Sequence, residues 1–438
     1  MIIEALEKVI AGEDLSRAEA RAAMEEYFSG RATDVQMHGL MTALQLKGMT
    51  REEQEEFEAS RGRHPDAQQR DDGAFEDRLD DVPFKELLLA KLLIFEGRDL
   101  PRRGAENAME NILEGRAPQT EIAQFLTALR FKGETVDELV GFASAMRRHA
   151  TPIFARGQRL ADDVLVDTCG TGGDVSGTFN ISTAAAFVVA GADVRVAKHG
   201  NRSISSKCGS VDVLEALGVQ VDLPPERVVQ SIDEVGIGFL FAPAVHTATR
   251  HAMPVRRELR IRTVFNLLGP LTNPAGANAQ VAGVYDGSVT ELMARALGEL
   301  GVRRAFVVHS EDGLDEISIS DETSVAELRD GDVRSYTIVP EDFGVSRAPL
   351  EEIRGGDAGH NARILSRMFG REGHPHEHGP YRDIVLANAS AALVAAGRAS
   401  DFSAGVRIAA ESIDSGAARA KLDALIAFSQ NAKSQSAS

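Results

Sequence analysis

Glycine, hydroxyl and acidic residues gather in one short part of the chain, Asp167–Asp174 followed by Thr178–Thr183. Three glycines between residues 170 and 174 allow the backbone to turn tightly and to point several N–H groups at one place, which is a way to bind phosphate. The spacing fits neither the dinucleotide-binding fingerprint nor the Walker A loop. A plain turn is the alternative interpretation.

The segments on either side favour the phosphate interpretation. The apolar run Val164–Val166 predicts a buried strand, and Ile181–Ala190 predicts a helix with Asn180 or Ser182 near its N-cap. A strand, a glycine loop and a helix N-terminus in this order present amides and a helix dipole to an anion.

A second loop of this kind follows the predicted strand Val194–Ala197 and precedes a predicted helix at Val211. Residues 198–207 contain two lysines, one arginine and three serines. Lysine supplies point charge for a phosphate, while hydroxyls and amides supply directed hydrogen bonds. A solvated basic loop is the alternative, but strand ends are where open α/β sheets bind ligands.

An acidic pair, Asp315-Glu316, comes a few residues after the predicted strand Ala305–His309. Such pairs are often solvated surface. Beside two phosphate loops, the pair suits Mg²⁺, which takes one or two carboxylates, waters and substrate phosphates. We therefore expect a magnesium site here.

Five arginines lie within residues 246–262, which precede the stretch Asn266–Pro274. One arginine facing a cleft would bind a carboxylate through its two-pronged guanidinium. Surface pairing with Glu258 is the alternative, and the sequence does not choose the arginine that faces inward.

The composition indicates an ordinary soluble globular protein of 438 residues, with room for two or three domains. A net charge of −18 argues against binding to nucleic acid or to an anionic membrane. The two cysteines exclude a disulfide framework and favour a reducing compartment, and the N-terminus lacks the pattern of a signal peptide. We expect a cytoplasmic protein.

An internal repeat occupies the N-terminal third. Asp14-Leu15 recurs 85 positions later as Asp99-Leu100, and Gly30-Arg-Ala32 recurs as Gly115-Arg-Ala117 at the same offset. The match continues without a gap over about fifty residues, so each copy predicts one small helical unit. The predicted domains are an extra helical copy (1–64), a charged linker (65–82), a small helical domain (83–152), a large α/β domain (153–430) and a disordered tail (431–438).

Strands and helices alternate after Val164, which predicts an α/β domain with a central, mostly parallel sheet. The further predicted strands are Ile237–Ala242 and Gln280–Tyr285. The further predicted helices are Val211–Leu217, Pro225–Val235, Val289–Leu300 and Tyr381–Ala396.

These motifs, in this order, resemble those of the anthranilate phosphoribosyltransferases of tryptophan biosynthesis. The resemblance runs from about Pro83 to about Phe428 and rests on Gly170–Asp174, Asn180–Thr183, Lys198–Asn201, Val255–Arg257, Arg262-Thr263, Phe265–Leu271 and Asp315-Glu316. It implies a small helical domain on a large α/β domain with the active site between them, usually in a homodimer. It implies transfer of the phosphoribosyl group of phosphoribosyl pyrophosphate to the amine of anthranilate, with Mg²⁺ as cofactor and no nucleic-acid or membrane partner.

The resemblance also implies roles for individual residues. The contacts to phosphoribosyl pyrophosphate would be Gly170, Gly173, Asp174, Thr178, Asn180, Ile181, Ser182, Thr183, Lys198, His199, Gly200, Asn201, Arg202, Ser203, Ile204, Ser205, Ser206 and Ser210. The anthranilate would meet Gly170, His199, Asn201, Arg256 and Pro270, with Arg256 on its carboxylate. Mg²⁺ would be held by Ser182, Asp315 and Glu316. We expect Lys198, Arg202 and His199 to act in catalysis.

The chain departs from the family pattern at several positions. Thr247 and Thr249 stand where proline and methionine are usual, Arg260 replaces a usual glycine and Val211 replaces an alanine. The first repeat copy is also extra. Two alternatives stay open: a related phosphoribosyltransferase or nucleoside phosphorylase with another acceptor, and a binding protein without catalysis, which the net charge disfavours.

Overall fold

The computed structural model describes residues 1–63, 82–154, 163–173, 176–203, 207–370 and 379–436. These residues form two compact units. The first unit comprises Met1–His149 and Ala248–Asn266, and the second comprises Ala150–Thr247 and Leu267–Ser438. None of the helices within the described ranges combines the length and the apolar character that crossing a membrane requires.

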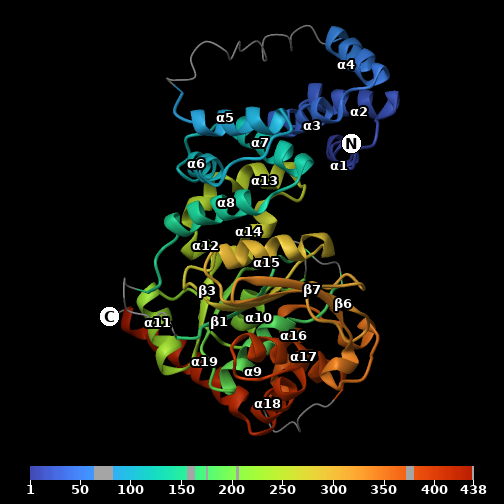
Figure 1. Cartoon of the computed structure of the whole chain (residues 1–438). Coiled ribbons are helices and arrows are strands. Elements are labelled where there is room, and N and C mark those ends of the chain that lie inside the picture. The colour runs from blue at the N-terminus through green and yellow to red at the C-terminus, as the bar shows by residue number, and fades with distance from the viewer. Residues whose placement is uncertain (64–81, 155–162, 174–175, 204–206, 371–378, 437–438) are drawn as a thin grey trace. The chain divides into compact units, whose positions relative to one another are not determined.

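The first unit is all helical (Figure 1). Its helices are α1 (Ile2–Ile10), α2 (Arg17–Phe28), α3 (Asp34–Lys47), α4 (Arg51–Arg63), α5 (Lys85–Phe95), α6 (Arg102–Leu113), α7 (Gln119–Lys132), α8 (Val136–His149) and α13 (Met253–Leu259), preceded by the 3₁₀ helix η3 (Thr247–His251). The helix α14 (Phe265–Leu271) spans the boundary between the two units.

The structure confirms the duplication. Helices α6 and α7 begin and end 85 positions after α2 and α3. The same buried ion pair also occurs in both copies: Lys47 Nζ lies 3.1 Å from Glu53 Oε2, and Lys132 Nζ lies 3.0 Å from Glu138 Oε2. Both glutamates are 0% exposed. A charge buried in this way needs its partners, so each copy depends on the same polar contacts.

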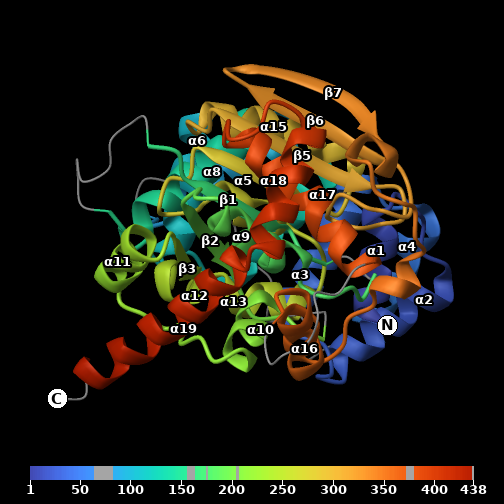
Figure 2. The same ribbon diagram turned by 90° about the horizontal axis from the view of Figure 1, so that it is seen from below.

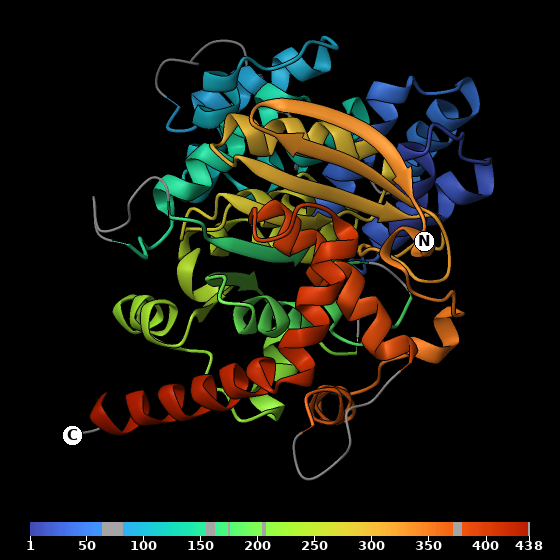
Figure 3. The ribbon, with the colours of Figure 1, turned by 60° about the horizontal axis from the view of Figure 1, so that its bottom comes forward.

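The second unit is built on a seven-stranded sheet in the order β3-β2-β1-β4-β5-β6-β7. The strands are β1 (Val166–Gly170), β2 (Val196–Gly200), β3 (Ile237–Phe241), β4 (Ala279–Gly283), β5 (Arg304–Ser310), β6 (Thr323–Arg329) and β7 (Asp332–Ile338). The first five strands are parallel, and β6 and β7 join antiparallel at one edge, as the orange hairpin in Figure 3 shows. The predicted mostly parallel sheet is confirmed.

Helices cover both faces of this sheet. They are α9 (Ile181–Gly191), α10 (Ser210–Ala216), α11 (Pro225–Glu234), α12 (Ala242–Val245), α15 (Thr290–Glu299), α16 (Ala358–Met368), α17 (Pro380–Ala395), α18 (Phe402–Asp414) and α19 (Ala417–Ser436), with 3₁₀ helices η4 (Gly287–Val289), η5 (Pro340–Phe343) and η6 (Leu350–Ile353). Because side chains alternate along a strand, Phe239 joins the core under α9 and α17, while Leu240 joins the core under α11. Figure 2 shows α9, α17 and α18 together.

Several sequence predictions need correction. The first two predicted strands begin two residues before β1 and β2 and end four and three residues before them, so Lys198 and His199 lie in β2 and not in a loop. The hairpin β6–β7 was missed, because its exposed edge strand has no apolar alternation. The disordered tail is wrong for residues 431–436, which continue α19.

The α/β domain was also expected to run unbroken from 153 to 430. Instead, residues 248–266 belong to the helical unit, because Val255 and Leu259 of α13 are buried there, where α13 packs against α3 and α7. The predicted linker falls almost entirely outside the described residues, as do Asp174, Ile204, Ser205 and Ser206.

Candidate active site

The site lies where the strand order of the second unit reverses, between β1 and β4. In open α/β sheets, ligands bind at this point, outside the carboxyl ends of the strands. Here the Thr171 N–H donates to the Gly283 carbonyl across 2.9 Å, and the Tyr285 N–H donates to Thr171 Oγ1 across 3.1 Å. The glycine loop after β1 is therefore held to the end of β4.

Asp315 lies directly against the glycine loop. The Gly172 N–H donates to Asp315 Oδ2 across 2.8 Å. A Cβ atom on Gly170 would overlap the same carboxylate oxygen, and one on Gly283 would overlap the Asp315 carbonyl. Gly172 and Gly173 also have φ values of 65° and 84°, which glycine adopts readily. The glycines thus serve both the turn and the approach of Asp315.

Glu316 lies at the beginning of α9. Its Oε1 accepts a hydrogen bond from the Ser182 N–H across 3.2 Å, where a negative charge is favoured by the helix dipole. The Ser182 carbonyl in turn accepts from Thr168 Oγ1 across 3.0 Å. The two carboxylates therefore contact the same amides that the sequence analysis assigned to phosphate.

Lys198 is a buried side chain, 3% exposed, beside this group. Its Nζ donates to the Thr168 carbonyl and to Ser182 Oγ, the latter across 3.3 Å. Burial lowers the pKa of Lys198 and raises the pKa of Asp167, whose carboxylate accepts from the His199 N–H across 3.1 Å. Lys198 thus links β2 to β1 and to the beginning of α9.

His199 is a neutral side chain. Burial, and then the neighbouring ring of His246 at 5.2 Å, lowers the pKa of His199 to about 3. Its Nδ1 lies 3.3 Å from the Gly269 carbonyl, which only accepts, so Nδ1 carries the proton. Nε2 is buried, and among the described atoms it has no hydrogen-bond partner. His199 therefore offers one lone pair as an acceptor.

Arg202 points to a pair of acids on α10. Its guanidinium makes two hydrogen bonds of 2.7 Å to Glu215 and one of 3.2 Å to Asp212. The expected role of Arg202 in neutralising pyrophosphate would thus require it to leave or share these partners.

The rest of the second loop is held by hydrogen bonds between its backbone and neighbouring side chains. The Ser203 N–H donates to Asp212 Oδ2 across 3.1 Å, and Ser210 Oγ donates to the Asn201 carbonyl across 3.2 Å. A Cβ on Gly200 would overlap the Ser210 hydroxyl. Gly200, Asn201, Ser203 and Ser210 therefore lie together in the structure.

Asn180 has a structural role in addition to its place at the α9 N-cap. Its amide donates to the Cys208 carbonyl across 3.2 Å and accepts from Asn361 Nδ2 across 3.0 Å. Ile181 and Thr183 are buried, and the Ile181 N–H donates to the Phe179 carbonyl across 2.8 Å. Thr178 forms an isolated bridge with Arg354.

Two expected acceptor contacts lie apart from these loops in the chain. Arg256 belongs to the first unit, where its guanidinium stacks 5.1 Å from the centre of the Phe265 ring. Burial lowers the pKa of Arg256, and no carboxylate pairs with it among the described residues. Pro270 lies in α14, and its carbonyl accepts from Gln280 Nε2 across 2.8 Å.

Sequence reasoning missed the buried amides that support the site. Asn273 Nδ2 donates to Asp167 Oδ2 and to the Ala197 carbonyl, both across 2.8 Å, and thereby links β1 to β2. Gln280 and Asn361 have comparable roles. Single amide residues give no local signal, although Asn273 stood in a stretch that the sequence analysis quoted.

The residues fit a magnesium ion that completes its shell with water and substrate. No group of three or more His, Cys, Asp or Glu side chains that could hold a metal occurs in the described ranges. Asp315, Glu316 and the Ser182 hydroxyl nevertheless lie at one loop and one helix end, which suits Mg²⁺ because it usually keeps several waters.

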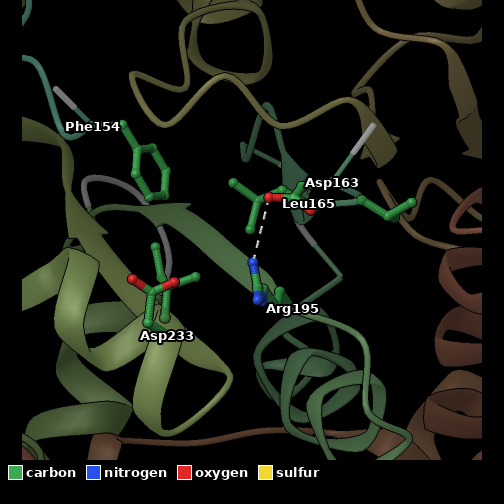
Figure 4. Close-up of a pocket in the computed structure, with 7 residues that line it drawn as sticks. Phe154, Asp163, Leu165, Arg195 and Asp233 are labelled. Carbon is green, nitrogen blue, oxygen red and sulfur yellow. Dashed lines mark ion pairs between the residues drawn. The ribbon is translucent and has the colours of Figure 1, made fainter. Parts of the chain in front are cut away.

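One cavity of the second unit lies away from this site. It has a volume of about 30 Å³, room for about one water, and lies at the amino ends of β1 and β2 (Figure 4). Asp163 and Arg195 line it as an ion pair at 3.7 Å. A second, smaller cavity lies under Thr183 and Lys198.

The fold and the site define a glycosyl transferase with a helical bundle and an α/β domain. The model of the family's a/b domain matches residues 162–419, and the model of its helical bundle domain matches residues 3–57 and 88–150, which means both repeat copies. The anthranilate phosphoribosyltransferases of Symbiobacterium thermophilum and Solibacter usitatus are 56% and 55% identical to the chain. Each match covers 78% of this chain and 98% of the relative.

Solved structures of anthranilate phosphoribosyltransferases are also similar to this chain. Anthranilate phosphoribosyltransferase from Thermus thermophilus is 43% identical with a TM-score of 0.72, over 78% of this chain and 99% of that one. The Saccharomyces cerevisiae enzyme in complex with PRPP and Mg is 27% identical with a TM-score of 0.70, over 79% and 98% of the two chains. This chain belongs to the anthranilate phosphoribosyltransferase family.

Proposed function

We propose that the chain transfers the phosphoribosyl group of phosphoribosyl pyrophosphate to the amine of anthranilate and releases pyrophosphate, the second step of tryptophan biosynthesis from chorismate. The observation that carries this proposal is the meeting of three strand-end segments in one place. Asp315 contacts Gly172, Glu316 contacts Ser182, and Lys198 reaches Ser182 from the next strand. A ligand with both a sugar and a diphosphate needs several such segments.

The donor side is built to stabilise the leaving group. As pyrophosphate departs, negative charge grows on its oxygens and positive charge grows at the anomeric carbon. The glycine-loop amides and the α9 N-terminus are donors held in place before the reaction, and the buried Lys198 side chain lies beside them, so little reorganisation is needed. Mg²⁺ held by Ser182, Asp315 and Glu316 would neutralise phosphate charge when bound.

On the acceptor side, the reaction depends more on how anthranilate is positioned than on acid–base chemistry. The amine of anthranilate brings its own lone pair, so no strong general base is necessary. The neutral His199 can accept an N–H of the amine at Nε2 without becoming charged. Arg256 would bind the carboxylate of anthranilate. This carboxylate would supply the acidic partner that the Arg256 guanidinium lacks among the described residues.

The decisive experiment is turnover of anthranilate with phosphoribosyl pyrophosphate, followed by the loss of anthranilate fluorescence, with and without Mg²⁺. We expect turnover that requires the metal. A parallel panel of other aromatic amines and nucleosides covers the related activities; turnover of one of these in place of anthranilate would contradict the proposal.

Two further expectations belong to this proposal. A homodimer is expected from the resemblance, and light scattering of the purified chain would test it. A cytoplasmic location is expected from the composition.

A further inference from the structure

The segment 248–266 is held by both helical repeats. Within the first unit, α13 packs against α3 of the first copy and against α7 of the second copy. Helices α3 and α7 are equivalent in the two repeats and also pack against each other, so α13 lies against this central pair (Figure 1). The match to the Symbiobacterium thermophilum relative covers 98% of that protein but 78% of this chain, which has the helical repeat twice.

The first copy makes polar contacts that the second cannot make. Thr33 Oγ1 donates to Glu258 Oε2 across 2.6 Å, and Gln36 Nε2 donates to the Glu258 carbonyl across 3.0 Å. The positions equivalent to Thr33 and Gln36 in the second copy are Pro118 and Glu121. Proline has no hydroxyl, and an ionised glutamate has no donor.

The first copy also leaves space for an apolar residue of α13. Leu259 is 0% exposed, and a Cβ on Gly39 would lie 2.8 Å from Leu259 Cδ2. The second copy has Gln124 at the equivalent position, and its amide instead contacts His38 Nδ1 at 2.9 Å. The absence of a side chain at Gly39 therefore gives Leu259 its space on the first copy.

These contacts fix the last turn of a helix of only seven residues. A helix this short has little stability of its own and depends on tertiary contacts. Arg256 lies in the same turn, and its carbonyl accepts the Arg260 N–H across 3.2 Å. Holding Glu258 and Leu259 therefore holds the backbone that carries Arg256.

We propose that Thr33, Gln36 and Gly39 of the extra repeat are positioning residues for Arg256, and so set the affinity for the carboxylate-bearing acceptor. This inference rests on the proposed function. It gives the extra repeat a part in acceptor binding without contact between the repeat and the acceptor.

The test compares KM values for the two substrates in the full-length chain. We expect the double variant Thr33→Val/Gln36→Ala to raise the KM for anthranilate about fivefold and to leave the KM for phosphoribosyl pyrophosphate within about twofold. The matched control is Ser16→Ala/Glu19→Ala. It removes the capping box of α2, which resembles that of α3 but has no bond to α13 among the described contacts. The control should leave both KM values unchanged.

A second variant protects the test against misfolding. Gly39→Ala favours the helix by its propensity and presses a methyl group on Leu259, so it should fold and still raise the KM for anthranilate. An unchanged anthranilate KM in both variants, or an equal rise in both KM values, would overturn the inference while the proposed function stands. No turnover of anthranilate by the unaltered chain would overturn both.

Discussion

Gly172 and Asp315 are 143 positions apart in the sequence, yet the N–H of one donates to the carboxylate of the other across 2.8 Å. This contact joins the glycine loop after β1 to the acidic pair after β5. A phosphate at the loop would compete with Asp315 for the amide, unless a cation lies between the two anions. If a phosphate binds this loop, the contact therefore favours a cation that binds together with it.

The first prediction concerns this carboxylate. Asp315→Asn keeps an acceptor for the Gly172 N–H but removes the charge, so it should lower turnover about 100-fold and raise the Mg²⁺ concentration needed for half-maximal rate. Steady-state rates across a Mg²⁺ titration measure both effects. Glu322→Gln, an exposed acid after the same strand, serves as the control. If the Asp315→Asn variant needed no more Mg²⁺ than the unaltered chain, Asp315 would not be a metal ligand.

The second prediction separates two roles of Arg202. If its charge binds pyrophosphate, Arg202→Ala should raise the KM for phosphoribosyl pyrophosphate about tenfold. Glu215→Ala removes one of the two acidic partners on α10 and leaves the longer bond to Asp212, so it should not raise this KM, because the guanidinium then turns to the substrate more easily. Equal increases in the two variants would mean that Arg202 only holds the loop to α10.

The third prediction concerns backbone strain at Arg260. Its φ of 54° places it in the left-handed region that favours glycine, and the family pattern has glycine here. Arg260→Gly should therefore stabilise the helical unit by about 1 kcal/mol. Arg257→Gly, inside α13, should instead destabilise it by about as much. Chemical denaturation followed by circular dichroism compares the two, and a loss of stability in Arg260→Gly would refute the argument.

The fourth prediction concerns pH. The pKa of His199 falls from 6.5 to about 3 on folding, so the unfolded chain binds a proton that the folded chain rejects. This contribution to the free energy of unfolding is complete above about pH 6.5 and is lost as the pH falls toward 3. His199→Gln cannot titrate and should lose less stability than the unaltered chain between pH 6.5 and 4.5. Parallel loss in both proteins would show that His199 stays charged or exposed.

The features that could be predicted from the sequence are those that a local pattern of residues encodes. Apolar runs and glycine clusters located the parallel strands and the loops after them, because each signal lies within a few residues. The placement of Lys198 in a strand was missed, since a lysine at a strand end has the same pattern whether it is buried or solvated. The partners of Arg202 and Asn180 were missed for another reason: they come from α10, the Cys208 region and α16, and no local spacing connects them.

The two repeat copies contain the same lysine–glutamate pair, so a property of one copy can be compared with the same property of the other. The Leu15 amide donates to Glu53, and the Leu100 amide donates to Glu138, across 2.7 and 2.9 Å. Because the two amides have the same local chemistry, their rates of hydrogen–deuterium exchange can be compared within one sample. A difference between these rates measures how firmly each of the two repeat copies is held in the folded chain.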